Sequence, residues 1–179
     1  MMKKWLGIII SAVMVVAVSS AGAFAANSAT INVTVSIAQE ASISVTGVPV
    51  DFGAMKIGGS AVSASAVVVK NNGSGGNQTY SLSLINPSGW TAVTTAPEVD
   101  QYRLSSAFDA TGAVTWNPTN HALTTSSQAS TATKFSGSET GTAVPYNADR
   151  HLYLKLETPS ATSLSGSKTI QIVVTASVD

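Results

Sequence analysis

Apolar and polar residues alternate along several stretches of this chain, and a period of two indicates β-strands. The clearest stretches lie near the two ends of the sequence. The early stretch has apolar residues at Ile31, Val33, Val35 and Ile37. The late stretch has them at Ile170, Ile172, Val174, Ala176 and Val178. In each stretch, one face is predicted to contact a core or a partner and the other face to contact solvent.

The same pattern predicts further strands between these two, separated by turn sequences rich in Gly, Asn and Pro such as 71–76 and 86–89. We expect about eight or nine strands and no helix after the leader. The segment 62–70 is rich enough in Val to be buried on both faces. The remaining predicted strands are 41–45, 50–52, 80–84, 90–93, 102–104, 114–116 and 152–156.

Short strands joined by such turns predict an all-β fold, an immunoglobulin-like or jelly-roll sandwich of two antiparallel sheets. The regular pattern weakens between 117 and 147, where Ser, Thr, Ala and Gly dominate. Long irregular insertions are frequent places for function.

The first 25 residues have the layout of a secretory signal peptide, which resembles bacterial ones. Lys3 and Lys4 precede an apolar run from Trp5 to Val18, and Ala23-Phe24-Ala25 forms a small-x-small cleavage site. A retained membrane anchor is the rival interpretation, but the run of about 14 residues is shorter than the roughly 20 needed to span a bilayer. We therefore expect one secreted domain, residues 26–179, with no membrane segment in its mature form.

The composition excludes some classes of function. The chain has no cysteine, so neither a disulfide nor a thiolate site can form. Without Lys3 and Lys4, seven of the nine basic residues remain against nine acidic ones, which gives a net charge of about −2. Nucleic-acid binding requires a basic surface, and this composition does not provide one.

Residues that could carry catalysis are sparse. The two histidines, His121 and His151, are far apart in sequence and lack metal-ligand spacing, so we interpret them as surface or loop imidazoles. Glu98 and Asp100 could share a strand face and act as the paired carboxylates of glycosidases do, but we interpret them as a solvated strand edge before Tyr102. We predict no enzyme activity, no catalytic residue, no metal and no cofactor.

Three aromatic residues, Trp90, Trp116 and Tyr146, are candidates for stacking on a glycan. Large aromatic side chains mostly fill protein cores, however, and Trp90 follows a turn and begins a predicted strand, which suits a core position. Both interpretations stay open at this stage.

Two regions resemble known families. Residues 29–37 followed by Val50-Asp51-Phe52-Gly53 resemble the opening of bacterial spore-coat-U-like and chaperone–usher fimbrial subunits. Those subunits usually carry a cysteine just before the Phe-Gly step and often an aromatic residue next to last, whereas this chain has Ala41-Ser42-Ile43-Ser44 and Val178. The region from Val67 to Trp90 resembles immunoglobulin-like domains of bacterial surface proteins.

The resemblance implies a structural subunit of an extracellular filament, fimbria or surface coat that self-assembles by strand addition. The candidate donor strand is the segment 31–37, directly behind the cleavage site. The same segment could instead pair within its own domain. A secreted, non-catalytic adhesion module for a glycan or cell-wall polymer is the alternative function.

The sequence makes one prediction about processing. The exported protein should begin at Ala26, because Ala23 and Ala25 are the small residues that signal peptidases require. Intact-mass measurement of the exported protein tests this. A mass that still includes Met1 to Ala25 would contradict it.

Overall fold

The computed structural model describes residues 34–36 and 38–179, which fall into two units, 1–38 and 39–179. The second unit is a nearly all-β sandwich of two sheets, as the alternation predicts. Of the first unit only Thr34, Val35, Ser36 and Ala38 are described, and none of them lies in a strand. The predicted leader and most of the candidate donor strand therefore lie outside the described residues.

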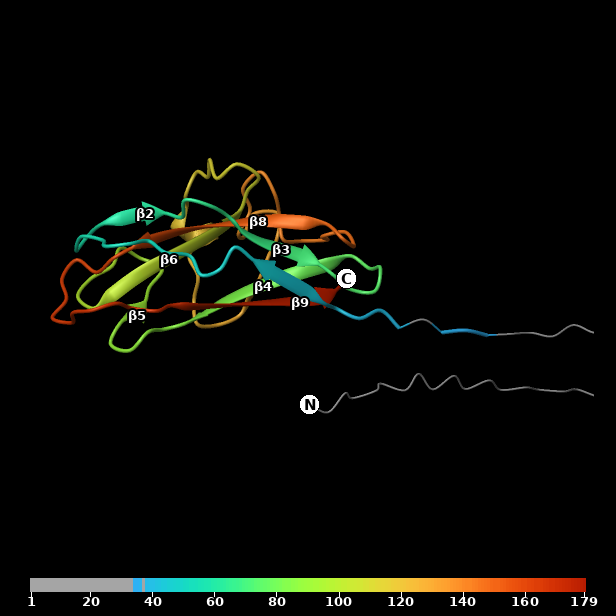
Figure 1. Cartoon of the computed structure of the whole chain (residues 1–179), viewed down its shortest axis with the longest axis horizontal. Helices are drawn as coiled ribbons and strands as arrows, with labels where there is room; N and C mark the ends of the chain where they lie inside the picture. Colours follow the sequence, from blue (N-terminus) through green and yellow to red (C-terminus); the bar gives the residue numbers. More distant parts are fainter. Residues whose placement is uncertain (1–33, 37) are drawn as a thin grey trace, which may run out of the picture. The chain divides into compact units, whose positions relative to one another are not determined.

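The larger sheet is built around β8 (Asp149–Glu157). Its strand order is β1 (Ile43–Thr46), β3 (Val67–Asn71), β8, β6 (Gln101–Phe108) and β5 (Thr91–Ala92). The short β2 (Ser60–Val62) pairs with β8 beside β3 (Figure 1). All these pairs are antiparallel except β5 with β6, which is parallel and departs from the wholly antiparallel sandwich predicted.

The smaller sheet has only three strands, in the order β7 (Gln128–Ala129), β4 (Gln78–Ile85) and β9 (Gln171–Val178). β4 and β9 pair antiparallel over their whole length, from Gln78 with Val178 to Ile85 with Gln171. β9 is therefore an edge strand.

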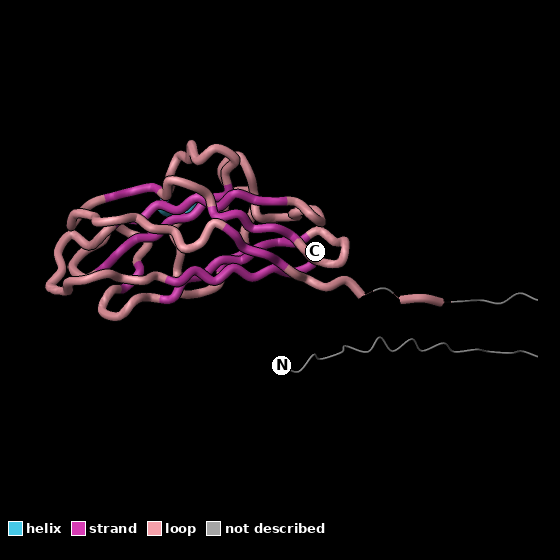
Figure 2. Tube along the Cα trace, in the orientation of Figure 1, coloured by secondary structure: helices cyan, strands magenta, loops and turns pink. Residues whose placement is uncertain are grey.

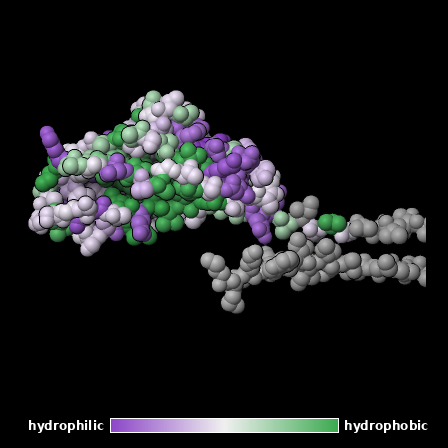
Figure 3. All heavy atoms as spheres, viewed as in Figure 1, coloured by the Kyte–Doolittle hydropathy of each residue, from purple (hydrophilic) through white to green (hydrophobic). Residues whose placement is uncertain are grey.

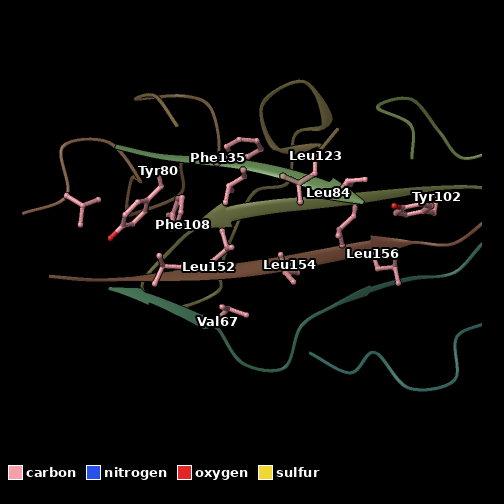
Figure 4. Packing of buried hydrophobic residues seen from close by; sticks show 14 residues of the cluster. Val67, Tyr80, Leu84, Tyr102, Phe108, Leu123, Phe135, Leu152, Leu154 and Leu156 are labelled. Carbon is pink, nitrogen blue, oxygen red and sulfur yellow. The ribbon is translucent and has the colours of Figure 1, made fainter. Parts of the chain in front are cut away.

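The core lies between the two sheets. Alternate residues of β4, namely Tyr80, Leu82 and Leu84, are fully buried against the inward residues of the larger sheet (Figure 4). The opposing side chains come from β3, β6 and β8, where period-two alternation places Val67, Val69, Leu104, Leu152, Leu154 and Leu156 inward. The low charge and the absence of cysteine are consistent with a fold held by this core and its backbone ladders.

One long side of the sandwich is closed by the irregular segment between β6 and β8, most of which is drawn as loop in Figure 2. Its backbone covers the outer edge of β4, because Val144 exchanges two hydrogen bonds with Gln78, and Gly141 accepts one from Tyr80. Its apolar side chains Leu123, Phe135 and Val144 are fully buried. The segment also contains the short helix α1 (Pro118–His121), which begins at the N-cap Asn117 and was not predicted. The segment is thus part of the core structure.

A buried amide network joins the two sheets at the turn between β3 and β4. Asn71 donates from Nδ2 to the carbonyls of Val144 (2.8 Å) and Gly76 (3.0 Å), and its Oδ1 accepts from the Gly73 amide. The Gln78 amide, oriented so that both its atoms are satisfied, bonds the backbone of Ser42. This network fixes the chain that leads into β1, since buried polar groups are costly unless paired.

Two predicted strands are absent, and one is divided. Residues 50–52 form no strand because Pro49 lacks an amide proton and the Asp51 carboxylate accepts from Gly53 N at 2.7 Å, which favours a local turn. Residues 114–116 form none because no neighbouring strand pairs with them. The run 62–70 is split between β2 and β3, and β3 is fully buried on one face only.

The closing segment should contribute strongly to stability. Leu123→Ala removes a fully buried side chain, so the free energy of unfolding should fall by about 2–5 kcal/mol. Leu164→Ala is the matched control, because Leu164 is 38% exposed and its truncation should cost less than about 1 kcal/mol. Urea unfolding measures both. Equal losses would show that the segment does not belong to the core.

Candidate functional site

The second long side of the sandwich, along β9, is open. The inward side chains of β9, Ile172, Val174 and Ala176, are only partly buried, although their partners on β4 are fully buried. At the opposite sheet, Val45 of β1 lies beside the buried Val69 yet is itself exposed. Apolar residues gather on this face across the middle of the domain (Figure 3). A row of inward side chains is thus left without a covering layer.

The backbone of β9 is also unpaired along this side. Asp179 N donates to Asn77 O, which sets the alternation of the β4–β9 ladder. In an antiparallel pair, bonded positions alternate with positions whose N–H and C=O point away from the partner. The positions of β9 whose N–H and C=O point away from β4 are Val178, Ala176, Val174 and Ile172. The residues of β9 that point their side chains inward therefore also present their backbone groups to the open edge.

The edge of β1 has the same property. Asn72 N donates to Ser42 O, and Ser74 N donates to Glu40 O. Bonded and non-bonded positions alternate along the β1–β3 pair, starting from the bonded Ser42. The backbone groups of Ile43 and Val45 therefore point away from β3. Among the described residues, neither β1 nor β9 has a strand on this side. Two free edges, one from each sheet, therefore flank the opening.

A groove of about 1290 Å³ lies between these edges. Its floor consists of inward residues of the larger sheet, chiefly Leu104, Leu154 and Leu156. One wall is the 171–174 part of β9, and the other is the chain from Val48 to Ile57. The loop 162–170 also lines the groove. The groove is larger than the 300–1,000 Å³ typical of small-molecule pockets, and four consecutive residues of β9, 171–174, line it.

Trp90 lies at the far end of the groove and packs against the core. Its ring is 6.1 Å from that of Tyr102, and the Lys168 ammonium lies 6.0 Å above it while donating to Ser88 O. The other two aromatic candidates lie elsewhere: Trp116 meets His121 edge-on at 5.7 Å, and Tyr146 is 58% exposed in the loop before β8. The structure does not bring the three rings together.

His121 is buried, which corrects its interpretation as a surface imidazole. Its Nδ1 accepts from Asn117 N at 3.1 Å, and its Nε2 lies 3.0 Å from Ser136 O, to which it donates in the matching tautomer. Burial lowers the pKa of His121, the Ser136 carbonyl opposes this, and Lys134 adds to the lowering. In its neutral form, the His121 ring therefore connects α1 to the loop at Ser136 through its hydrogen bonds.

Other charged groups form structural contacts. Burial alone would raise the pKa of Asp109, but hydrogen bonds from Ser138 and Thr111 outweigh it and hold the pKa below its usual range. Hydrogen bonds from Arg103, against a smaller effect of burial, lower the pKa of Glu157.

His151 contacts Glu139 at 3.3 Å, and Asp100 accepts from Thr162 rather than pairing with Glu98. Within residues 34–36 and 38–179, no three His, Asp or Glu side chains are grouped to hold a metal ion.

The candidate interface residues from the sequence fall on both sides of the described boundary. Of the late set, Ile170, Ile172 and Val174 line the groove, whereas Ala176 and Val178 lie on β9 beyond it; Ile170 lies just before the strand, which begins at Gln171. Of the early set, Ile31, Val33 and Ile37 lie outside the described residues, and Val35 is 75% exposed. The groove floor and the wall from Val48 to Ile57 were not anticipated, because in sequence they have the pattern of ordinary core strands.

Comparisons with protein-family models, curated proteins and solved structures find no match. In the part of the chain that the structure describes, no helix is both long and apolar enough to cross a bilayer.

The burial of His121 predicts a pH-dependent stability. Its folded pKa lies below the ordinary value near 6.5, so the unfolded chain binds the proton more readily. The free energy of unfolding should therefore fall as pH decreases from about 7.5 to 5. The lowered pKa values of Asp109 and Glu157 affect the free energy of unfolding only in more acidic solution, as pH falls below about 4.

Urea unfolding of His121→Gln across this range tests the assignment. The variant should lose the slope between pH 7.5 and 5 even if it is less stable at every pH. His151→Gln, which alters the half-exposed imidazole, should retain it. A slope that persists in His121→Gln would contradict the assignment.

Proposed function

We propose that this protein is a secreted structural subunit that assembles by strand addition, in which the segment 31–37 of one copy lies in the groove of another. The observation that carries this proposal is the condition of β9. Its inward side chains lack a cover, and the same residues present unpaired backbone groups to the opening. An added extended strand would satisfy both deficits at once.

The early segment has the composition that this groove requires. Its apolar residues recur every second position at Ile31, Val33, Val35 and Ile37, with small polar residues between. An antiparallel strand beside β9 would place these side chains opposite the inward residues of β9 and above the leucine floor. Full burial of each is worth about 1.5–3 kcal/mol, from which the cost of ordering the segment is subtracted. The apolar floor suits such a segment better than the hydroxyl groups of a glycan.

A second copy is a better source of this strand than the same copy. Folding back into its own groove would require the chain to reverse at Ala38-Gln39, because Glu40 and Ser42 are already bonded to the β3–β4 turn. Tight two-residue reversals favour Gly, Asn or Asp, and neither residue is one of these.

The absence of cysteine allows a direct test by engineered disulfides. Val35→Cys combined with Val174→Cys or Ile172→Cys should give a ladder of covalent oligomers on a non-reducing gel, which collapses on reduction. A cross-link from Val35 to either Val174 or Ile172 supports the proposal, because both of these β9 residues line the groove. The matched control is Val35→Cys with Thr175→Cys, since Thr175 is exposed on the outer face of the same strand and does not line the groove.

A second variant separates donation from folding. Val33→Asp with Val35→Asp should leave the protein folded by circular dichroism but monomeric by size-exclusion chromatography, because the charges cannot be buried in the groove. Unfolding of this variant would show instead that the segment is a core strand of its own domain. Oligomers that persist, or cross-links equally strong at Thr175, would overturn the proposal.

A further inference from the structure

The sandwich has two chemically different ends, which the strand registers define. The turn end contains the β3–β4 turn and the loop 145–147, because Asn147 N bonds Asn71 O and Asp149 pairs with Lys70. The far end contains the chain from Val48 to Ile57 and the loop 162–170, because Gly58 N bonds Pro159 O beyond the end of β8. In Figure 1 the turn end lies on the right, near the C-terminus, and the far end on the left.

Exposed apolar side chains occur at both ends. At the far end, Val48, Ile57 and Leu164 are exposed on the rim of the groove. At the turn end, Tyr146 is the large apolar side chain that the described part of the chain leaves in solvent. We call the first group the far-end rim.

The start of the domain is fixed at the turn end. Glu40 N donates to Ser74 Oγ at 2.6 Å, and Ser74 N donates back to Glu40 O at 3.1 Å. The Gln39 side chain lies beside Gly76. Two residues, Ala38 and Gln39, separate the Glu40 anchor from Ile37, and two residues span at most about 7 Å. A donated strand 31–37 therefore cannot be far from the turn end of the copy that donates it.

Strand direction then decides which surfaces meet. β9 runs from the far end toward the turn end. A donor antiparallel to β9 would have Ile37 at the far end of the accepting copy, so the donor's turn end would abut that far end. A parallel donor would bring two turn ends together. Every copy both donates and accepts, so the parallel arrangement permits only a closed, reciprocal pair, whereas the antiparallel arrangement repeats without closing.

We infer that successive copies abut end to end, with the turn end of one copy, including Tyr146, seated on the far-end rim of the next. This contact deepens the proposed function and rests on it. It joins Tyr146 to Val48, Ile57 and Leu164, so that exposed apolar surface at both ends is covered by a second copy of the chain. The two-residue connection limits bending between copies, and the contact adds a second interface to the donated strand.

Cysteine pairs at the two ends test this contact in the full mature chain. Tyr146→Cys combined with Ile57→Cys, or separately with Leu164→Cys, should give a ladder of dimers, trimers and larger species on a non-reducing gel, since a disulfide forms only when the Cα atoms lie within about 7 Å. Tyr146→Cys with Val68→Cys is the control, because Val68 lies on the outer face of the larger sheet, and this pair should give no ladder.

The outcomes distinguish this contact from strand donation itself. A Tyr146 ladder together with the Val35–Val174 or Val35–Ile172 ladder supports the inference. Groove cross-links without a Tyr146 ladder overturn the end-to-end contact and leave strand donation standing. A covalent dimer from Tyr146→Cys alone also overturns it, because that product requires two turn ends to meet. Loss of both ladders would contradict the proposed function and the end-to-end contact together.

Discussion

The three-stranded sheet is too narrow to cover the larger sheet that it faces, and this mismatch determines where the surface is apolar. The closing segment after β6 compensates on one side by inserting Leu123, Phe135 and Val144 and by pairing with β4. Nothing among the described residues does the same beside β9. A groove is therefore lined by Leu154, Leu156, Ile172 and Val174, although in a closed sandwich the same pattern would be ordinary core.

A buried amide network holds the turn end of the domain. Asn71 and Gln78 tie both sheets and the chain entering β1 to one turn, with no disulfide to help. Since buried amides are costly unless paired, the network specifies one geometry at the turn end. The anchor at Glu40 belongs to the same turn. The position from which the N-terminal segment leaves is thereby fixed by the same contacts that hold the core.

Periodicity predicted the strands that have one buried face, and it failed where a strand depends on its neighbours. β4, β8 and β9 alternate because one face of each meets the core. Residues 50–52 and 114–116 alternate equally well in sequence, yet neither finds a paired edge. The groove could not be predicted for a related reason, since Leu154 has the same pattern whether a strand covers it or not. The burial of His121 depends on contacts with Asn117 and Ser136 that no local pattern encodes.

The edge of β9 lacks the protection that sheet edges usually carry. Natural edge strands are commonly guarded by charged residues, by proline or by bulges that prevent pairing with another chain. From Gln171 to Val178 there is no charged residue and no proline, and β9 stays paired in unbroken register with β4. The segment 31–37 is equally free of charge and proline. An unguarded edge over an apolar groove is an aggregation hazard in a protein that stays alone. In a subunit whose edge is filled by a matching strand, the same features define the interface, and any guard placed on β9 would block assembly.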